Sequence, residues 1–275
     1  MMDADTQRLA DFVQRVTGIK LPGSKHAFIE GRLRKRMLLL GFSEISDYAK
    51  FCLDRGGMAA EEIPIIDALT TNKTDFFRES HHFHFLETNG LPRLYRAGIG
   101  VHRPLQIWSA GCSFGPEPYS LAMTCSEFAE TTGRFEFHIT ASDISARALN
   151  EAASGTYQHD FIEPVPMTLR KKYLLRSFAG GEDRVRISPE IKAKVTFLRM
   201  NILEFPYNFT KKFHIIFCRN MLIYFSRENQ FVVLSNLINF LEPNGILILG
   251  HSESIWGFDL PLRTVGPTIF QREQV

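Results

Sequence analysis

Five polar side chains suited to binding a ligand each follow a short apolar run of the sequence. They are Glu117, Asp143, Asn201, Arg219 and Asn220. In an open α/β sheet the ligand lies beyond the carboxyl ends of the strands, so we expect these residues to gather at one edge. Carboxylates at such an edge disfavour a pyrophosphate and favour a ligand that carries hydroxyl groups and a positive charge.

The turn before Glu117 distinguishes between two classes of cofactor. Its glycines, Gly111 and Gly115, are four residues apart, which excludes the G-x-G-x-x-G pattern of dinucleotide-binding proteins. Asp143 also follows Gly111 by well over the roughly 20 residues that this pattern requires. A carboxylate there can accept both hydroxyls of a ribose, Asn201 can pair with the edge of an adenine, and Ile202 can pack on its face. The series predicts S-adenosylmethionine, which has no phosphate.

Simpler structural roles are open for two of these residues. Asp143 could cap the helix that follows it, although Ser145 is better placed for that role. Glu117 could be a first-turn acid that interacts favourably with the helix dipole. The prediction of a cofactor site therefore depends on the series of strand ends and not on either carboxylate alone.

The spacing of apolar residues differs between the N-terminal part of the chain and the rest. Residues 1–70 carry apolar residues at helical spacing, which predicts an all-α N-terminal domain. Residues 71–97 form a linker. In residues 98–275, strand-length apolar runs alternate with helical segments, which is typical of an α/β domain whose largely parallel sheet is covered on both faces. The last expected strand, at 268–271, is placed at a sheet edge.

One segment, at about 157–194, interrupts this alternation. It holds a helical stretch at 168–175, a glycine turn at Gly180-Gly181 and an alternating run at 184–188. We interpret it as an inserted antiparallel β-subdomain. It is either a structural elaboration or a surface that contacts a partner.

The linker opens on a second cluster of polar residues. The segment 69–79 combines threonine, asparagine, aspartate and arginine side chains with two adjacent phenylalanines. One interpretation is a capped helix start that buries both aromatic rings. The other is a segment that folds over the cofactor, with Asn72, Thr74 and Arg78 facing it.

Composition narrows the class of protein. The 275 residues are 44% hydrophobic and carry a net charge of +2, so we expect a globular protein without general affinity for nucleic acid. The four cysteines form no C-x-x-C pair, which favours a reducing, cytoplasmic setting over a disulfide framework. No signal peptide is visible, and the apolar runs are too short to insert into a membrane. His81, His82 and His84 lack completing ligands, so no metal site is predicted.

Four longer motifs, in order along the chain, resemble the CheR family of chemotaxis-receptor glutamate O-methyltransferases. They are Thr-Thr-Asn-x-Thr-x-Phe-Phe-Arg-Glu at 70–79, Trp-Ser-Ala-Gly-Cys-Ser-x-Gly-x-Glu-Pro-Tyr-Ser at 108–120, Ala-Ser-Asp-Ile at 141–144 and Phe-Cys-Arg-Asn-x-x-Ile-Tyr-Phe at 217–225. The resemblance extends to Gly-His-Ser-Glu-Ser at 250–254 and so covers almost the whole chain. It implies a class I S-adenosylmethionine-dependent methyltransferase domain with an inserted β-subdomain, preceded by an all-α domain.

The resemblance also implies roles for individual residues. S-adenosylmethionine, which leaves as S-adenosylhomocysteine, would be bound by Asn72, Thr74, Arg78, Gly111, Glu117, Asp143, Asn201, Ile202, Arg219 and Asn220. Tyr224 would act at the active site with a linker arginine, for which Arg93 and Arg96 are both candidates. The acceptor would be a glutamate in the cytoplasmic domain of a methyl-accepting chemotaxis receptor. The alternatives are a methyltransferase with another acceptor and a non-catalytic cofactor-sensing module.

A basic helix is the candidate contact with that receptor. Arg32, Lys35 and Arg36 lie at i, i+3 and i+4 and so share one helix face. Such a face is either simply solvated or docks onto acidic receptor helices. Some family members bind a pentapeptide of the receptor through the β-subdomain, and the turn at 177–183 is short for that role. We therefore expect no pentapeptide tether. We also expect a monomer.

Overall fold

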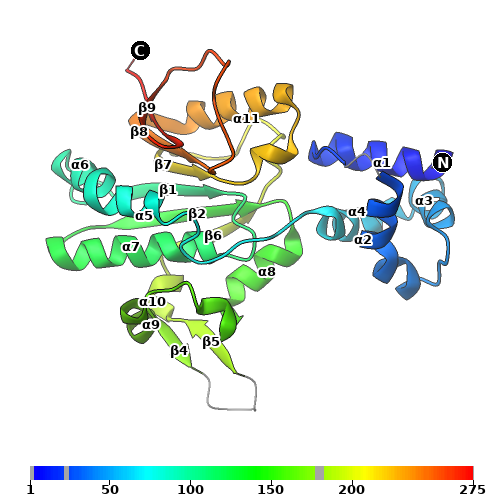
Figure 1. Cartoon of the computed structure of the whole chain (residues 1–275), viewed down its shortest axis with the longest axis horizontal. Coiled ribbons are helices and arrows are strands. Elements are labelled where there is room, and N and C mark those ends of the chain that lie inside the picture. Colours follow the sequence, from blue (N-terminus) through cyan, green and yellow to red (C-terminus); the bar gives the residue numbers. More distant parts are fainter. Residues whose placement is uncertain (1–2, 22–24, 177–182, 275) are drawn as a thin grey trace.

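A computed structural model describes residues 3–21, 25–176 and 183–274 (Figure 1). Its N-terminal part consists of helices α1 (Ala4–Thr17), α2 (Lys25–Leu39), α3 (Ile45–Asp54) and α4 (Met58–Leu69). These helices enclose a hydrophobic core of their own, which includes Leu9, Leu33, Tyr48 and Ile65. The predicted all-α domain is therefore confirmed. None of the helices described in this chain is long and apolar enough to span a membrane.

The second part is built on a seven-stranded sheet with the order β6-β2-β1-β7-β8-β10-β9. Its strands are β1 (Leu105–Ala110), β2 (Phe137–Asp143), β6 (Val195–Arg199), β7 (Phe213–Cys218), β8 (Leu241–Leu249), β9 (Leu262–Gly266) and β10 (Ile269–Arg272). The first five strands in this order are parallel, and β10 pairs antiparallel with both β8 and β9. This confirms the predicted class I methyltransferase architecture.

The placement of the last strand at a sheet edge is wrong. β10 lies between β8 and β9, and β9 forms the edge beyond it. The residues of β9, Leu-Arg-Thr-Val-Gly, show no clear strand pattern, because only two of them are large and apolar. As the edge strand, β9 pairs with one neighbour only, β10.

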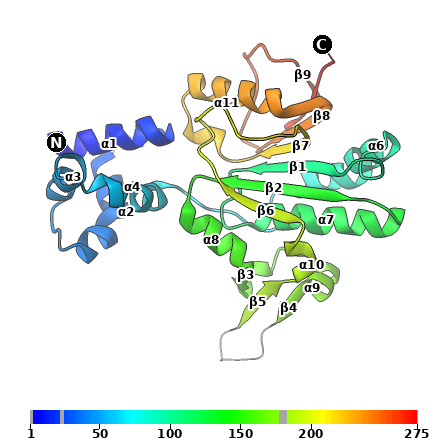
Figure 2. The same cartoon turned by 180° about the vertical axis from the view of Figure 1, so that it is seen from behind.

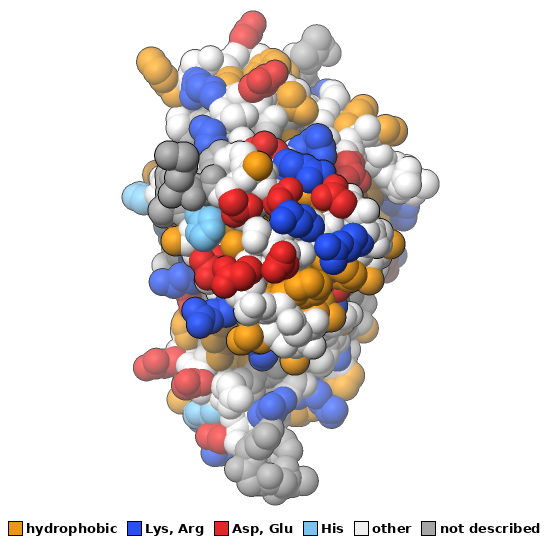
Figure 3. All heavy atoms as spheres, turned by 90° about the vertical axis from the view of Figure 1, so that its right-hand side faces the viewer, with side chains coloured by type: hydrophobic (Ala, Val, Ile, Leu, Met, Phe, Trp, Pro, Cys, Tyr) orange, Lys and Arg blue, Asp and Glu red, His pale blue; other side chains and the backbone are white. Residues whose placement is uncertain are grey.

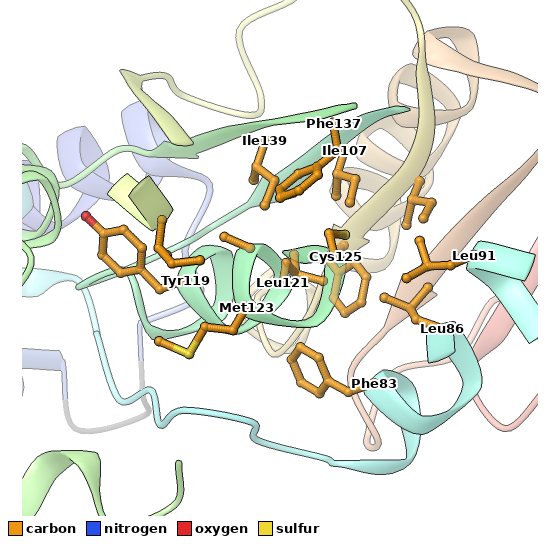
Figure 4. Close-up of a cluster of buried hydrophobic side chains, with 14 of the residues drawn as sticks. Phe83, Leu86, Leu91, Ile107, Tyr119, Leu121, Met123, Cys125, Phe137 and Ile139 are labelled. Atoms are coloured by element: carbon orange, nitrogen blue, oxygen red, sulfur yellow. The ribbon is translucent and has the colours of Figure 1, made fainter. Parts of the chain in front are cut away.

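Helices cover both faces of the sheet. One face packs against α5 (His81–Phe85), the π-helical turn η1 (Leu86–Gly90), α6 (Leu91–Arg96) and α7 (Pro116–Thr132), and Figure 4 shows the apolar side chains between them. The other face packs against α11 (Arg227–Phe240). Neighbouring residues of a strand therefore enter different cores, as Ile107 and Trp108 do. Burial on both sides explains the continuous apolar runs in the sequence.

The inserted segment forms a second sheet with the order β3-β5-β4, all antiparallel. It comprises β3 (Thr156–Gln158), η2 (Asp160–Ile162), α9 (Met167–Tyr173), β4 (Leu174–Arg176), β5 (Arg184–Ile187) and α10 (Pro189–Lys192), and it follows α8 (Ala146–Ser154). Figure 2 shows it projecting from one side of the main sheet. The predicted β-subdomain is confirmed, but the helix expected at 168–175 ends earlier, because Leu174 pairs with Ile187 of β5. The turn at 177–183, with Gly180-Gly181, lies outside the described residues except for Asp183.

Candidate active site

A cavity of about 290 Å³ lies where the carboxyl ends of the parallel strands meet the linker and the helical domain. Its lining includes all the residues predicted for the cofactor, together with Tyr224. The helical domain adds Thr17, Ile19, Lys20 and Phe28, which were not predicted. The structure therefore brings three separate parts of the chain to one site.

Arg219 lies at the centre of a buried charge network beside the cavity. Its side chain is 2% exposed, and its Nη1 lies 3.2 Å from Oε2 of Glu117. Its Nη2 lies 3.3 Å from Oε2 of Glu79 and also donates to the backbone carbonyl of Arg78. The arginine at the end of β7 thus fixes the linker against the turn that follows β1.

The two carboxylates of this network differ in their proton affinity. Burial raises the pKa of Glu117, although the charge of Arg219 and the hydrogen bond from Ser109 oppose the shift. Burial also acts on Glu79, but hydrogen bonds from Asn220 and the charge of Arg219 outweigh it and lower its pKa. Glu79 therefore stays ionised and neutralises part of the arginine charge, a role that the sequence did not reveal.

Asp143 ends β2 and orders the turn between strand and helix. Its Oδ2 accepts a hydrogen bond of 2.8 Å from the N–H of Ser113, and its Oδ1 accepts one of 2.9 Å from the N–H of Ser145. Ser145 itself caps α8 by accepting from the N–H of Ala148. Burial raises the pKa of Asp143, and these backbone donors oppose that shift. The helix cap is therefore Ser145, which leaves Asp143 available to a ligand in the cavity.

Gly111 lets the backbone pass close to the cavity. Its φ of 78° is in the left-handed region, and a Cβ at this position would lie 3.0 Å from Sδ of Met221. The strand-to-helix turn and the loop after β7 can therefore approach each other only with glycine here.

A loop after β7 carries Tyr224, and one carboxylate holds that loop in place. The loop ends in the 3₁₀ turn η3 (Leu222–Tyr224). Glu253 Oε1 accepts hydrogen bonds from the N–H groups of Met221 (2.8 Å) and Leu222 (2.6 Å). Its Oε2 accepts from the N–H groups of Asn220 (2.9 Å) and Gly250 (2.6 Å). Burial raises the pKa of Glu253, and these donors oppose that shift.

The helical domain joins the site through the segment 17–20. Ile19 forms an antiparallel bridge with Phe225, and the N–H of Lys20 donates to the carbonyl of Tyr224 at 2.7 Å. Gly18 has a φ of 67° and lies so close to Leu203 that a Cβ would overlap its side chain. The end of α1 is therefore a wall of the cavity.

The donors and acceptors around the cavity fit S-adenosylmethionine. Nδ2 of Asn72 and Nε of Arg219 are buried and have no hydrogen-bond partner in the part of the chain that the structure describes. Buried polar groups are normally hydrogen-bonded, so both atoms suit a polar ligand. The carboxylates of Asp143 and Glu117 also line the cavity and can accept from hydroxyl or ammonium groups.

Comparison with known proteins agrees with this geometry. The family model described as "CheR methyltransferase, SAM binding domain" matches residues 72–270, and the one described as "CheR methyltransferase, all-alpha domain" matches residues 4–70. The chain belongs to the CheR methyltransferase family. S-adenosylmethionine is accordingly its cofactor.

Several relatives in the CheR family match almost their full length. Chemotaxis protein methyltransferase 2 of Pseudomonas aeruginosa is 36% identical, over 97% of this chain and 92% of that protein. The chemotaxis protein methyltransferase of Borreliella burgdorferi is also 36% identical, over 92% and 89% of the two chains. The Escherichia coli protein with that name is 33% identical, over 98% and 91%.

The two linker arginines predicted for the active site of this CheR-family chain lie apart from the cavity. Arg93 and Arg96 lie on α6, and neither lines the cavity. Arg93 donates to the carbonyl of Asn244 at 3.1 Å, and Arg96 donates to that of Pro92. The elements α5, η1 and α6 carry the chain away from the carboxyl ends of the strands (Figure 1), and an active-site role for either residue stays a prediction. The linker arginine that lines the cavity is Arg78.

The side chain of Asn201 has several hydrogen-bond partners within the chain. Its Nδ2 donates to the carbonyl of Val16 at 2.7 Å and to Oε1 of Glu204 at 3.0 Å. Its Oδ1 accepts from the N–H of Leu203. The amide N–H groups therefore tie the helical domain to the end of β6. The oxygen Oδ1 can still accept from a further donor, so pairing with an adenine edge stays a prediction. Ile202 beside it is buried and provides an apolar wall.

The predicted basic face of α2 is partly used inside this CheR-family protein. Arg36 forms two hydrogen bonds with Glu61, which is 2% exposed, and this contact lowers the pKa of Glu61. Arg32 donates to the carbonyl of Thr70 and to Oγ1 of Thr71, while Lys35 is exposed. Figure 3 shows basic and acidic side chains mixed on this end of the molecule. Arg32 and Arg36 therefore have structural roles, and the three residues do not form a uniform basic patch.

Proposed function

We propose that this protein transfers the methyl group of S-adenosylmethionine to glutamate side chains of bacterial chemoreceptors, which produces glutamate methyl esters. The relatives named chemotaxis protein methyltransferases support this proposal over almost the full length of the chain. The observation that carries it is the single cavity in which the cofactor residues meet Tyr224 and Arg78. A hydroxyl and a guanidinium at that place suit a carboxylate acceptor.

The residues of the cavity act by positioning the reactants. When bound, S-adenosylmethionine supplies a methyl group on a positively charged sulfur. A glutamate carboxylate has a pKa near 4.3, so it is already ionised at neutral pH and needs no general base. Arg78 and the hydroxyl of Tyr224 can orient it by charge-assisted hydrogen bonds. The rate then depends on alignment, because a well-oriented pair of reactants reacts far faster than the same groups free in solution.

We also propose that the receptor approaches the open end of the cavity beside the helical domain. Lys35 is an exposed cation on α2 and can meet acidic receptor helices. Arg32 and Arg36 would contribute less, since both already have partners within the chain. The protein would act as a monomer and without a pentapeptide tether.

Methyl transfer to purified receptor fragments tests the function. The full chain is incubated with methyl-labelled S-adenosylmethionine and a cytoplasmic receptor fragment, and the label is followed before and after mild base. We expect protein-bound label that mild base releases as methanol, because methyl esters hydrolyse in base. A matched fragment with its candidate glutamates changed to glutamine should accept none. Label that resists base, or that appears equally on the glutamine fragment, would show another acceptor group.

A further inference from the structure

We propose that Lys20 positions the acceptor: its ammonium group attracts the carboxylate of the incoming glutamate and holds it beside Tyr224. The inference rests on the proposed function, since it assigns a further residue to recognition of the same acceptor. It would make the helical domain a direct contributor to the reaction site.

The backbone pairing places Lys20 opposite Tyr224. Ile19 pairs with Phe225 in an antiparallel bridge, and the next residue of one segment faces the preceding residue of the other. The hydrogen bond of 2.7 Å from the N–H of Lys20 to the carbonyl of Tyr224 fixes this register. Side chains that lie directly opposite in an antiparallel pair share one face. Both residues line the cavity, which agrees with this register.

Lys20 differs from the two arginines of the cavity, which are engaged within the chain. It also differs from Lys73, a second exposed lysine of the lining, because Lys20 is the one that pairs with Tyr224 beside the backbone bridge. Arg219 is buried and engaged by Glu117 and Glu79. Arg78 donates from Nη1 to the carbonyl of Lys73. Lys20 is exposed, and its ammonium group has no ion pair or hydrogen bond within the described residues. It is therefore a cation at the mouth of the cavity, where a macromolecular acceptor must enter.

The chemistry of the reaction suits a cation of this kind. The substrate carboxylate is negative, whereas the methyl ester product is neutral, so the attraction acts on the substrate and ends with the transfer. Because Lys20 is exposed, water and salt screen its field. The screening keeps the attraction modest, so the carboxylate oxygen remains nucleophilic. A glutamine side chain has the same shape but no charge, so Lys20 favours glutamate over glutamine.

Kinetics of Lys20→Met with a receptor fragment test this assignment. We expect the KM for the fragment to rise about 2- to 5-fold, with kcat and the cofactor Kd changed less than about twofold. Lys20→Arg should restore the KM, because it restores the charge. Lys212→Met, at an exposed lysine outside the cavity lining, is the matched control and should behave as the unmodified protein. Raising the salt concentration should increase the KM of the unmodified protein more than that of Lys20→Met.

Other outcomes overturn the proposal and separate it from the proposed function. A weaker cofactor Kd with an unchanged KM for the fragment would show that Lys20 serves the carboxylate of the cofactor. A KM that rises equally in Lys20→Met and Lys20→Arg would show a packing role without a charge effect. Unchanged kinetics in Lys20→Met would show no role. If the unmodified protein forms no base-labile ester on any fragment, the proposed function fails, and this inference fails with it.

Discussion

Tyr224 contributes two separate groups to the site. Its backbone carbonyl accepts from Lys20, while its hydroxyl has no hydrogen-bond partner within the described residues. Replacing the hydroxyl therefore leaves the fold of the loop unchanged, because Glu253 and Lys20 hold the backbone.

We predict that Tyr224→Phe keeps its cofactor affinity and loses rate. A hydrogen bond to a charged group is worth about 1.5–3 kcal/mol, so kcat should fall roughly 10- to 100-fold. Cofactor binding by calorimetry and initial rates of methyl transfer measure the two effects. Tyr95→Phe, on α6 and outside the cavity, is the control. A variant that binds the cofactor poorly but keeps its kcat would contradict the assignment.

At the level of single residues, the sequence predicted the groups that follow strands but not their partners. Glu117 and Asp143 could be predicted because each carboxylate directly follows a buried strand or its turn, where an α/β fold binds its ligand. Glu79 and Glu253 could not, since their roles depend on contacts with Asn220 and Arg219, far away in the chain. The position of Arg93 outside the cavity lining could not be predicted either, because it depends on the path of α5 and η1.

The junction between α1 and the sheet domain depends on a glycine with two requirements. Gly18 has a left-handed backbone that ends the helix, and it lies against Leu203. Gly133 has a φ of 78° at the end of α7, but nothing lies within 4 Å of a Cβ built there. A comparison of alanine substitutions at Gly18 and Gly133 therefore separates the energetic cost of the backbone conformation from that of close packing.

We predict that Gly18→Ala is more damaging than Gly133→Ala. The left-handed conformation alone costs a non-glycine residue about 1–2 kcal/mol, which both variants incur. Gly18→Ala must also displace Leu203, so we expect a larger loss in the free energy of unfolding and a weaker cofactor Kd. Chemical denaturation and cofactor titration measure these effects. Equal losses in both variants, with the same cofactor Kd, would refute the role of the junction.

The elements that the sequence predicted well are those with a strong period or a buried run. β7 is buried throughout, and α8 carries its apolar residues on one face. β4 and β9 were missed because each is short and partly exposed, so neighbouring strands determine them more than their own residues do. The positions of β10 and β9 in the sheet depend on which strands pair in the folded chain, and no local sequence pattern predicts that pairing.

For the molecule as a whole, buried histidines link stability to pH. His82, on α5 of the linker, packs against Phe217 of β7, is fully buried, and has its Nε2 2.9 Å from Oγ1 of Thr268. Burial, aided by the charge of Arg219, lowers its pKa from 6.5 to about 3. Between these values the unfolded chain binds a proton that the folded chain does not, so the free energy of unfolding falls as the pH falls.

We predict that this histidine costs the fold about 2 kcal/mol between pH 7 and pH 5. Denaturant titrations at several pH values would show the decline in the unmodified protein and a shallower one in His82→Gln. His214, whose pKa burial lowers to about 4, continues to titrate in both proteins and contributes to the remaining slope. The comparison uses slopes, so a uniform loss of stability in the variant does not affect it. Parallel slopes would contradict the prediction.

The contact of segment 17–20 with the loop that follows β7 has a consequence for recombination between relatives. A chimera joined at the apparent boundary near residue 70 would bring a foreign segment 17–20 to the native loop after β7. The hydrogen bond from Asn201 to Val16, the fit of Gly18 to Leu203 and the pairing of Ile19 with Phe225 would then have to form between residues of different parents. The helical domain can therefore be exchanged only together with the loops after β6 and β7 that contact it. Functional crossover points should lie outside the helical domain and outside these loops.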